Sequence, residues 1–270
     1  MTSIEEIANE AEAADGAAPL DEATLRTLRH HPDRVRTWTQ DDGFALLVGN
    51  ELTLVVRPEA RRRGVGRRLL EQSLSESGSG ELLAWSHGNH PAAAALAAAY
   101  GFERVRDLWV MRRPLTDLPP LPDTDVEVRG YRPEDAADIV RVNAAAFAAH
   151  PEQGAMDEAE LAERMAEDWF DPAGLLVATR EGRVVGFHWT KHHDARLGEV
   201  YVVGVDPSAQ GGGLGKVLTL AGLHHLARTG HTEVLLYVES DNTRAVRVYA
   251  GLGFTHAPED THVQYRRAPR

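Results

Sequence analysis

Two copies of one pattern run through the 270-residue chain, and this internal repeat limits the possible folds more than any other feature. The segment VRPEARRRGVGRRLLEQ at residues 56–72 corresponds to VDPSAQGGGLGKVLTLA at residues 205–221, with Gly64 opposite Gly213 at a spacing of 149 residues. The length allows one large domain or two modest ones. The repeat favours two similar domains.

Each copy carries the same order of expected elements. ELTLVV and EVYVVGV have the composition of buried strands, and a proline-containing turn and a glycine loop follow each of them. A helix comes next, then a second strand, LLAW or EVLLYV, and a second helix, HPAAAALAAAY or NTRAVRVYAGL. The second helices end at a Gly-Phe pair, where Phe102 corresponds to Phe254. This order predicts an α/β fold.

The segment PLTDLPPLPDTD, residues 114–125, separates the two copies. Its four prolines disfavour both a helix interior and a central strand. We therefore expect an N-terminal domain over residues 1–113, a proline-rich linker over residues 114–125 and a C-terminal domain over residues 126–270.

Composition excludes several classes of function. Because the chain has no cysteine, it has no disulfide, thiolate metal site or cysteine nucleophile. A formal net charge of −12 argues against nucleic-acid binding, and the one basic cluster lacks interleaved aromatic residues: Arg61, Arg62, Arg63, Arg67 and Arg68. The first residues are acidic, and no stretch approaches the roughly 20 apolar residues of a membrane helix. We expect a cytoplasmic protein without a membrane partner.

The glycine loops have the spacing Arg/Gln-x-x-Gly-x-Gly. This spacing differs from the dinucleotide fingerprint and from the P-loop, because Gly215 and Lys216 are followed by Val217 rather than Ser or Thr. Such a loop can be a tight turn without a ligand. It can also be an anion cradle, in which glycines allow close approach and the helix N-terminus offers unpaired N–H groups. The presence of two copies favours the cradle, and a pyrophosphate fits it.

These residues resemble the GNAT acyltransferases, whose Arg/Gln-x-x-Gly-x-Gly/Ala signature grips the pyrophosphate of acetyl-CoA. The strings FAAHPEQG, EDWFDPAGLL, GFHWTK, LGEVYVVGVDPSAQ and VLLYVESDNTRAVRVYAGLGF resemble, more narrowly, the mycothiol synthase family of tandem GNAT enzymes. The resemblance covers residues 126–265 densely and residues 15–115 more loosely. It implies a mixed α+β fold of two tandem GNAT-type domains, each a mostly antiparallel twisted sheet with flanking helices. The implied reaction, the last step of mycothiol biosynthesis, moves acetyl from acetyl-CoA to the cysteinyl amine of desacetylmycothiol, a cysteine-glucosamine-inositol conjugate.

The resemblance also implies where acetyl-CoA binds in the C-terminal copy. Main-chain groups of Val203, Gly204 and Val205 would pair with the pantetheine arm like an added strand. The pyrophosphate would be bound by Gln210, Gly211, Gly212, Gly213, Leu214, Gly215 and Lys216. A second CoA-contacting helix would begin at Asn242, Ala245 and Arg247. Because Gly211 and Gly212 stand where the family often has arginines, the N–H groups and Lys216 would carry more of the binding.

The first copy has the more basic loop, RRRGVG. We hypothesise that it retains a CoA site without turnover, formed by Leu54, Val55, Val56, Arg62, Arg63, Gly64, Val65, Gly66 and Arg67. The alternative is that these arginines form a solvated face and that the domain is purely structural.

Comparison of the two copies assigns catalysis to the second. Glu199 precedes Gly213 by 14 residues, and the same place in the first copy is occupied by an asparagine. Tyr249 precedes the Gly-Phe phenylalanine by five residues, where the first copy has an alanine. We expect Glu199 to be the general base, acting through water or as a ligand for the amine, and Tyr249 to be the general acid. The alternatives are a solvated strand-edge carboxylate and a core aromatic residue.

A polyol that carries an ammonium group favours carboxylate partners. By resemblance, the substrate-contacting positions are Glu22, Glu152, Lys191, Glu199 and Tyr237. Since Glu22 belongs to the first copy, the substrate is expected near the domain junction.

The adjacent histidines at residues 192–193 and 224–225 lack the i,i+4 spacing of a helical metal site. We expect no metal. Acceptors other than desacetylmycothiol stay open, among them an antibiotic amine, another small amine or a protein N-terminus, as does a non-catalytic CoA-binding module. The sequence is compatible with a monomer and does not fix the oligomeric state.

Overall fold

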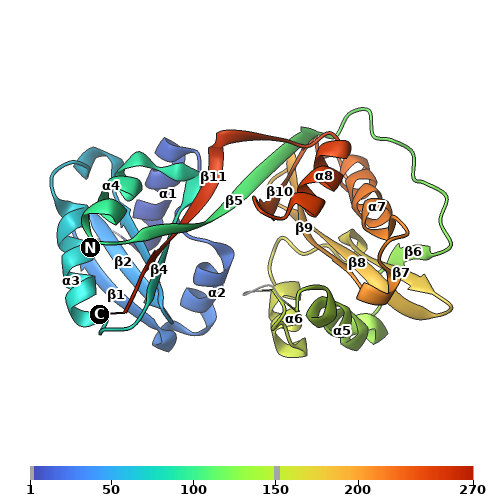
Figure 1. The fold of residues 1–270 in the computed structure, drawn as a ribbon, viewed down its shortest axis with the longest axis horizontal. Coiled ribbons are helices and arrows are strands. Elements are labelled where there is room, and N and C mark those ends of the chain that lie inside the picture. Colours follow the sequence, from blue (N-terminus) through green and yellow to red (C-terminus); the bar gives the residue numbers. More distant parts are fainter. Residues whose placement is uncertain (1–2, 149–152, 270) are drawn as a thin grey trace. The chain divides into compact units, whose positions relative to one another are not determined.

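The structure is a computed structural model that describes residues 3–148 and 153–269. The chain forms two compact units. Unit 1 comprises Met1–Val110, Glu239–Asn242 and His256–Arg270, and unit 2 comprises Met111–Val238 and Thr243–Thr255. Figure 1 shows that each unit combines a sheet with flanking helices.

Unit 1 has the strand order β1-β2-β3-β4-β11-β5. The strands are β1 (Val35–Gln40), β2 (Gly43–Val48), β3 (Glu51–Val56), β4 (Leu82–Ser86), β5 (Glu103–Pro114) and β11 (Thr255–Arg267). The helices are α1 (Ile4–Asp15), α2 (Glu22–His30), α3 (Val65–Glu76) and α4 (Pro91–Ala99). Strands β1, β2 and β3 pair antiparallel, as do β4 and β11, whereas β3 and β4 are parallel.

Unit 2 has the strand order β5-β10-β9-β8-β7-β6. Its strands besides β5 are β6 (Glu127–Gly130), β7 (Leu175–Arg180), β8 (Arg183–His192), β9 (Leu197–Val205) and β10 (Glu233–Glu239). Its helices are α5 (Ala136–Ala146), α6 (Glu158–Met165), α7 (Leu214–Arg228) and α8 (Thr243–Gly251). Strands β6 to β9 pair antiparallel, and β9 and β10 are parallel. The predicted fold class, two mixed domains with mostly antiparallel sheets, is confirmed.

The repeat seen in the sequence is also a repeat of structure. Helices α3 and α7 both begin after a left-handed glycine, Gly64 at φ 83° and Gly213 at φ 80°. A short 3₁₀ turn precedes each loop, η2 (Pro58–Ala60) in unit 1 and η6 (Pro207–Ala209) in unit 2. Helices α4 and α8 begin 152 residues apart, the spacing expected from Phe102 and Phe254.

The division into units departs from the repeat at two long strands. Strand β5 continues from unit 1 into unit 2, and most of β11 belongs to unit 1 although it ends the second copy. Residues Val263 to Arg267 of β11 pair antiparallel with Ser86 to Leu82 of β4. The sheet of unit 1 is therefore completed by the last strand of the chain.

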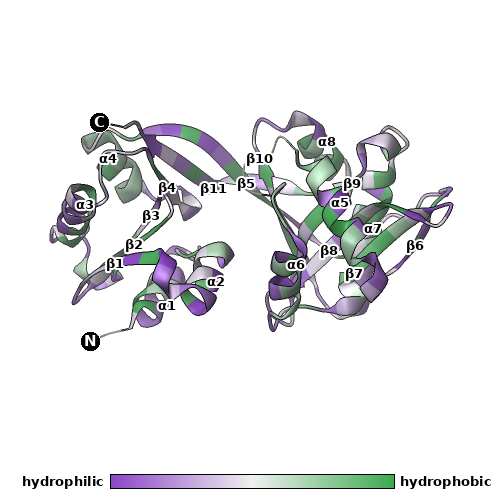
Figure 2. Cartoon of the chain, turned by 90° about the horizontal axis from the view of Figure 1, so that it is seen from below, coloured by the Kyte–Doolittle hydropathy of each residue, from purple (hydrophilic) through white to green (hydrophobic). Residues whose placement is uncertain are grey.

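Apolar strands form the cores, and Figure 2 shows hydrophobic residues along the central strands of each unit. In unit 1, Phe44 of β2 is fully buried, as is Leu69 of α3. In unit 2, Phe187 and Trp189 of β8 are fully buried. Strands β7 and β8 are joined by Glu181 and Gly182, both with positive φ, as a two-residue hairpin turn requires. Within the described residues, no helix has the length and apolarity needed to cross a membrane.

Candidate functional site

The parallel strands β9 and β10 are paired over only part of their length. Their register ends at Val200 opposite Leu236, whereas β9 continues to Val205. On the other side, β9 stays paired with β8 as far as Val205. The predicted pantetheine positions Val203 and Gly204 thus lie beyond the paired part of β9 and β10. Main-chain groups on the β10 side of this segment can take an added strand.

The glycine loop between β9 and α7 is open. Gly211 has φ 96° and Gly213 has φ 80°, a left-handed conformation that glycine adopts without a Cβ clash. A Cβ placed on Gly211, Gly212 or Gly213 would meet no atom within 4 Å. Because Gly213 caps α7, the first N–H groups of the helix face this open loop. The arrangement suits an anion.

Asp206 stabilises the turn that leads into the loop. Its Oδ1 accepts hydrogen bonds from the N–H and the hydroxyl of Ser208, at 3.0 and 2.7 Å, and its Oδ2 pairs with Arg141 at 2.7 Å. The Ser208 hydrogen bonds, followed by Arg141, lower the pKa of Asp206 to about 2. A carboxylate that stays charged at neutral pH therefore holds the start of the loop in place.

The first residue of the signature ties each loop to the preceding strand. Gln210 Nε2 donates to the carbonyl oxygen of Val205 at 3.3 Å. In unit 1, Arg61 Nε donates to the carbonyl oxygen of Val56 at 3.1 Å. Both pairs are separated by five residues, so the Arg/Gln preference has a common structural basis: a side-chain N–H that closes the turn.

A cation from α8 approaches the glycine loop of unit 2. Arg244 Nη1 donates to Gln210 Oε1 at 3.2 Å, and Arg244 is exposed. Arg244 was not among the predicted CoA residues, although the repeat contained a signal for it, because Ala92 occupies the corresponding place in the first copy. Arg244 supplies a positive charge beside the loop, where Gly211 and Gly212 offer none.

The other predicted CoA residues of unit 2 lie around the same loop and helix. Gly215 and Lys216 are in the first turn of α7, where Lys216 is exposed. The N–H of Asn242 donates to the carbonyl oxygen of Glu239 at 3.0 Å, just before α8 begins. Ala245 is partly buried on α8 and Arg247 is exposed. The CoA contact of Arg247 stays a prediction.

Glu199 is a buried carboxylate with a histidine partner. It is 5% exposed, and its Oε2 lies 2.6 Å from Nε2 of His193, whose side chain is 31% exposed. A buried carboxylate needs such a hydrogen bond, since desolvation otherwise disfavours its charge. The alternative of a solvated strand-edge carboxylate is therefore wrong. His193 connects Glu199 with the solvent, a role that was not predicted from the sequence.

Lys191 lies on the same side of the sheet as Glu199. The two residues are register partners on β8 and β9. The Lys191 ammonium lies 5.0 Å from the ring centroid of Trp169 and 5.5 Å from that of Tyr201. A β-bulge between Trp189 and Thr190 puts Tyr201 out of the regular pairing. Aromatic faces thus hold the ammonium group beside the buried carboxylate.

Tyr249 is a half-buried residue of α8, and its ring contacts Phe254 edge-on with centroids 5.9 Å apart. Burial raises the pKa of Tyr249 to about 12. The phenol therefore stays protonated at neutral pH, which is the form that a general acid requires. The ring contact is equally expected of a core aromatic residue, so the geometry of Tyr249 alone leaves its role open.

The remaining predicted substrate residues are not brought together within one unit. Glu22 is the first residue of α2 in unit 1 and forms an ion pair with Arg26 at 3.5 Å. Tyr237 lies on β10 in unit 2 and is 40% exposed. Glu152 falls outside the described residues.

Unit 1 has the same loop geometry with different chemistry. The pairing of β3 with β4 is recorded at Glu51 opposite Leu83, before the predicted CoA strand residues Leu54, Val55 and Val56. Arg61 forms a two-point ion pair with Asp15 of α1 at 2.6 and 2.8 Å. The exposed loop residues are Arg62, Arg63, Gly64 and Arg67, whereas Val65 is buried and Gly66 is partly buried. The ion pair between Arg61 and Asp15 therefore attaches α1 to the glycine loop of unit 1.

Comparisons with known proteins agree with this geometry. Residues 141–254 match the model described as "Acetyltransferase (GNAT) family", and residues 32–104 match the "Acetyltransferase (GNAT) domain". Two solved structures share the fold at 21% identity. One is a GCN5-related N-acetyltransferase from Sphaerobacter thermophilus, with a TM-score of 0.68 over 98% of this chain and 90% of that one. The other is a tandem GNAT protein from the clavulanic acid biosynthesis pathway, with a TM-score of 0.69 over 97% and 94%.

Curated relatives are closer in sequence. A mycothiol acetyltransferase of Nocardioides sp. is 62% identical over 99% of this chain and 97% of its own length. The mycothiol acetyltransferase of Mycolicibacterium smegmatis is 50% identical over 94% of this chain and 91% of its own length. Identity at this level over nearly the whole length confirms the resemblance found in the sequence. The chain therefore belongs to the mycothiol acetyltransferase family, within the GNAT acetyltransferases.

Proposed function

We propose that unit 2 of this enzyme transfers acetyl from acetyl-CoA to the cysteinyl amine of desacetylmycothiol, the step that completes mycothiol. The observation that carries the proposal is the position of Glu199: a buried carboxylate on β9, directly before the segment where β9 extends beyond its pairing with β10. The names of the relatives supply the acceptor.

Acetyl-CoA enters between β9 and β10 in this proposal. Val203, Gly204 and Val205 pair with the pantetheine arm, and the N–H groups at the start of α7 bind the pyrophosphate. Arg244 adds a charge-assisted contact to the phosphates, replacing the arginines that the loop lacks. The thioester then lies along β9, on the side toward Glu199.

The reaction joins the amine nitrogen to the thioester carbonyl carbon, and the carbon–sulfur bond breaks. An α-amino group has a pKa of about 7.7 to 8.0 in water, so part of the substrate is already neutral at pH 7. Attack by the neutral amine puts a positive charge on its nitrogen, and Glu199 accepts the proton that this nitrogen loses, directly or through water. His193 passes this proton to the solvent. Tyr249 donates its phenolic proton to the departing thiolate and regains a proton from the solvent.

Substrate recognition uses charged groups around this centre. Lys191, held by Trp169, and the exposed Tyr237 contact the sugar and inositol hydroxyls, while Glu199 also orients the ammonium group. We keep Glu22 and Glu152 as proposed contacts. Unit 1 is proposed to retain a CoA site without turnover, because it has the open strand pair and the basic loop but no counterpart of Glu199.

Release of coenzyme A with four acceptors tests the proposed function. We expect turnover with desacetylmycothiol to exceed that with free cysteine, glucosamine or an aminoglycoside by at least about 100-fold in kcat/KM, as several lost polar contacts would give. Similar rates with all four acceptors would contradict the substrate while leaving an acetyltransferase. Preference for the aminoglycoside would favour an antibiotic-modifying enzyme.

The Arg244→Ala substitution should raise the Kd for acetyl-CoA at unit 2 by about 10-fold, because one charge-assisted contact contributes roughly 1.5 kcal/mol. Isothermal titration of the full chain measures this change and also counts the sites. The control is Arg228→Ala, an exposed arginine at the far end of α7 that is not among the predicted CoA residues, which should leave the Kd within twofold. Equal effects of both substitutions would show only a general charge effect. A second site that Arg244→Ala leaves unchanged is expected if unit 1 binds CoA.

A further inference from the structure

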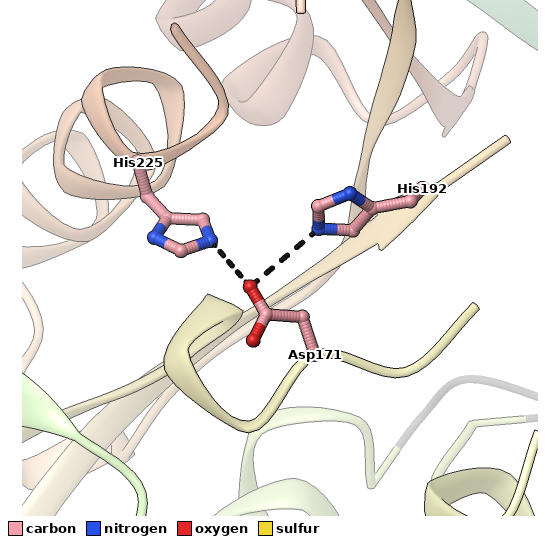
Figure 3. Close-up of side chains that lie close together, drawn as sticks. All are labelled: Asp171, His192 and His225. Atoms are coloured by element: carbon pink, nitrogen blue, oxygen red, sulfur yellow. Dashed lines mark hydrogen bonds and ion pairs between the residues drawn. The ribbon is translucent and has the colours of Figure 1, made fainter. Parts of the chain in front are cut away.

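Three potential metal ligands meet in unit 2 from three separate elements. Asp171 precedes η5 (Pro172–Gly174), His192 ends β8, and His225 lies on α7. One ligand atom from each lies within 4.8 Å of the other two. Figure 3 shows the Nε2 atoms of both rings directed at the same carboxylate oxygen. Nε2 of His225 is 2.9 Å and Nε2 of His192 is 3.7 Å from Asp171 Oδ2.

Hydrogen bonding within the protein accounts for only part of this cluster. The bond from His225 Nε2 to Asp171 uses Oδ2, and Oδ1 accepts the N–H of Ala173 at 2.9 Å. Nε2 of His192, however, is buried and has no hydrogen-bond partner among the described residues, because 3.7 Å is too long. Nε2 of His231, whose ring lies 4.6 Å from that of His192, is likewise buried without a partner. A buried imidazole nitrogen without a partner is costly unless a ligand, an ion or a water satisfies it.

The three side chains differ in their exposure to solvent. The side chain of His192 is 25% exposed. His225 is 6% exposed and Asp171 has a side-chain exposure of 29%, so the carboxylate leaves an entry from the solvent.

We propose that Asp171 Oδ2, His192 Nε2 and His225 Nε2 bind one divalent transition-metal ion of the zinc class. Two imidazoles and a carboxylate suit Zn²⁺ or Co²⁺, whereas Mg²⁺ and Ca²⁺ prefer oxygen ligands throughout. Bond lengths of about 2.0 to 2.2 Å in a tetrahedral site require ligand atoms roughly 3.3 Å apart. The distances of 2.9 and 3.7 Å lie on either side of this value. Side-chain shifts of a few tenths of an ångström bring both carboxylate distances to this value. The two histidine nitrogens, which lie within 4.8 Å of each other, must also approach, and water completes the fourth position.

The proton balance of binding is simple. His225 gives up the Nε2–H bond to Asp171 and binds through Nε2, with its proton on Nδ1, so the ring stays neutral. His192 binds in its neutral form. The carboxylate compensates one charge of the ion, and the site carries one net positive charge when water is the fourth ligand.

The ion would connect the segment before β7, the end of β8 and the last turn of α7. His192 adjoins His193, which contacts Glu199 from the other side of the strand. Fixing the end of β8 would therefore position His193 without contact between the metal and the reacting atoms. The proposal rests on Asp171, His192 and His225 alone and is independent of the acceptor.

Metal titration of the untagged full chain, after removal of metal by chelator and dialysis, tests the site. With Co²⁺, we expect visible d–d absorption of a tetrahedral complex that saturates at one ion per chain, and Zn²⁺ should displace it. Zn²⁺ should also raise the Tm. The Asp171→Asn and His192→Gln substitutions should each weaken Co²⁺ binding by more than about 100-fold, exceeding the effect of losing an outer partner.

The control is His224→Gln, which removes the neighbouring imidazole on α7, partly buried and hydrogen-bonded to the carbonyl oxygen of Pro119. This variant should bind Co²⁺ like the parent chain. The metal-free Tm of each variant shows whether it is folded. The substitutions are made at Asp171 and His192, which are partly exposed, so the test does not depend on a change at the buried His225. Absence of saturable Co²⁺ absorption in the parent chain, or equal binding by His192→Gln, would overturn the proposal.

Discussion

The Glu199→Gln variant is expected to have a kcat/KM at least about 100-fold below that of the parent enzyme, because a positioned general base contributes typically 10² to 10⁴ in rate. Glutamine keeps the shape of the side chain and can accept one hydrogen bond from His193, so the fold should persist. It cannot accept the proton of the attacking amine. Coenzyme A release at saturating acetyl-CoA measures the loss of activity. An unchanged Kd for acetyl-CoA would show that this loss occurs in the acetyl-transfer step.

Two further variants separate proton transfer from a change in charge. Glu233→Gln alters an exposed carboxylate on β10 that pairs with Arg112 at 3.6 Å, and it should keep kcat/KM within about twofold. His193→Gln keeps Glu199 but removes the titratable link to the solvent. We expect it to lower kcat more than it raises KM and to change the pH profile. If Glu199→Gln retained a third or more of the parent activity, Glu199 would not be the base.

Local patterns were enough to predict the elements that repeat. The strand ELTLVV coincides with β3, and HPAAAALAAAY contains α4, because hydrophobic runs and glycine or proline boundaries are encoded by neighbouring residues. The glycine loops were predictable for the same reason, since left-handed positions such as Gly213 need glycine. Comparing two copies in one chain then pointed to Glu199 without any other sequence.

Contacts between distant segments were not predictable in this way. The partner of Glu199 is a histidine that directly follows the preceding strand, and the arginine at Gln210 comes from a helix 34 residues later. Adjacent histidines were judged by their spacing along the chain, yet His192 meets a residue 33 positions away on α7. The position of β11 in the sheet of unit 1, and the continuation of β5 into unit 2, likewise depend on which strand edges meet. No local sequence pattern encodes this pairing.

Gly222→Ala is expected to destabilise the enzyme by about 3 kcal/mol, near the upper end for overpacked cores. Alanine in place of glycine in a helix usually stabilises by up to about 1 kcal/mol. At Gly222 of α7, however, a Cβ would lie 2.0 Å from the ring of His188, which is fully buried on β8. The ring cannot simply turn away, because its Nδ1 is 2.7 Å from the carbonyl oxygen of Leu218. Helix α7 and strand β8 must therefore move apart to accommodate the methyl group.

This prediction links packing to the site, since α7 begins at Gly213 and a displaced helix carries its N-terminus with it. Thermal unfolding should show a Tm lower by roughly 6 to 12 °C, together with a weaker Kd for acetyl-CoA. Gly251→Ala on α8 is the control, because its Cβ would meet no atom within 4 Å, and its Tm should stay equal or rise. Adding His188→Ala to Gly222→Ala makes room for the new methyl group, so the double variant should be more stable than Gly222→Ala alone. If the double variant were less stable, the cost would come from the helix backbone rather than from the contact with His188.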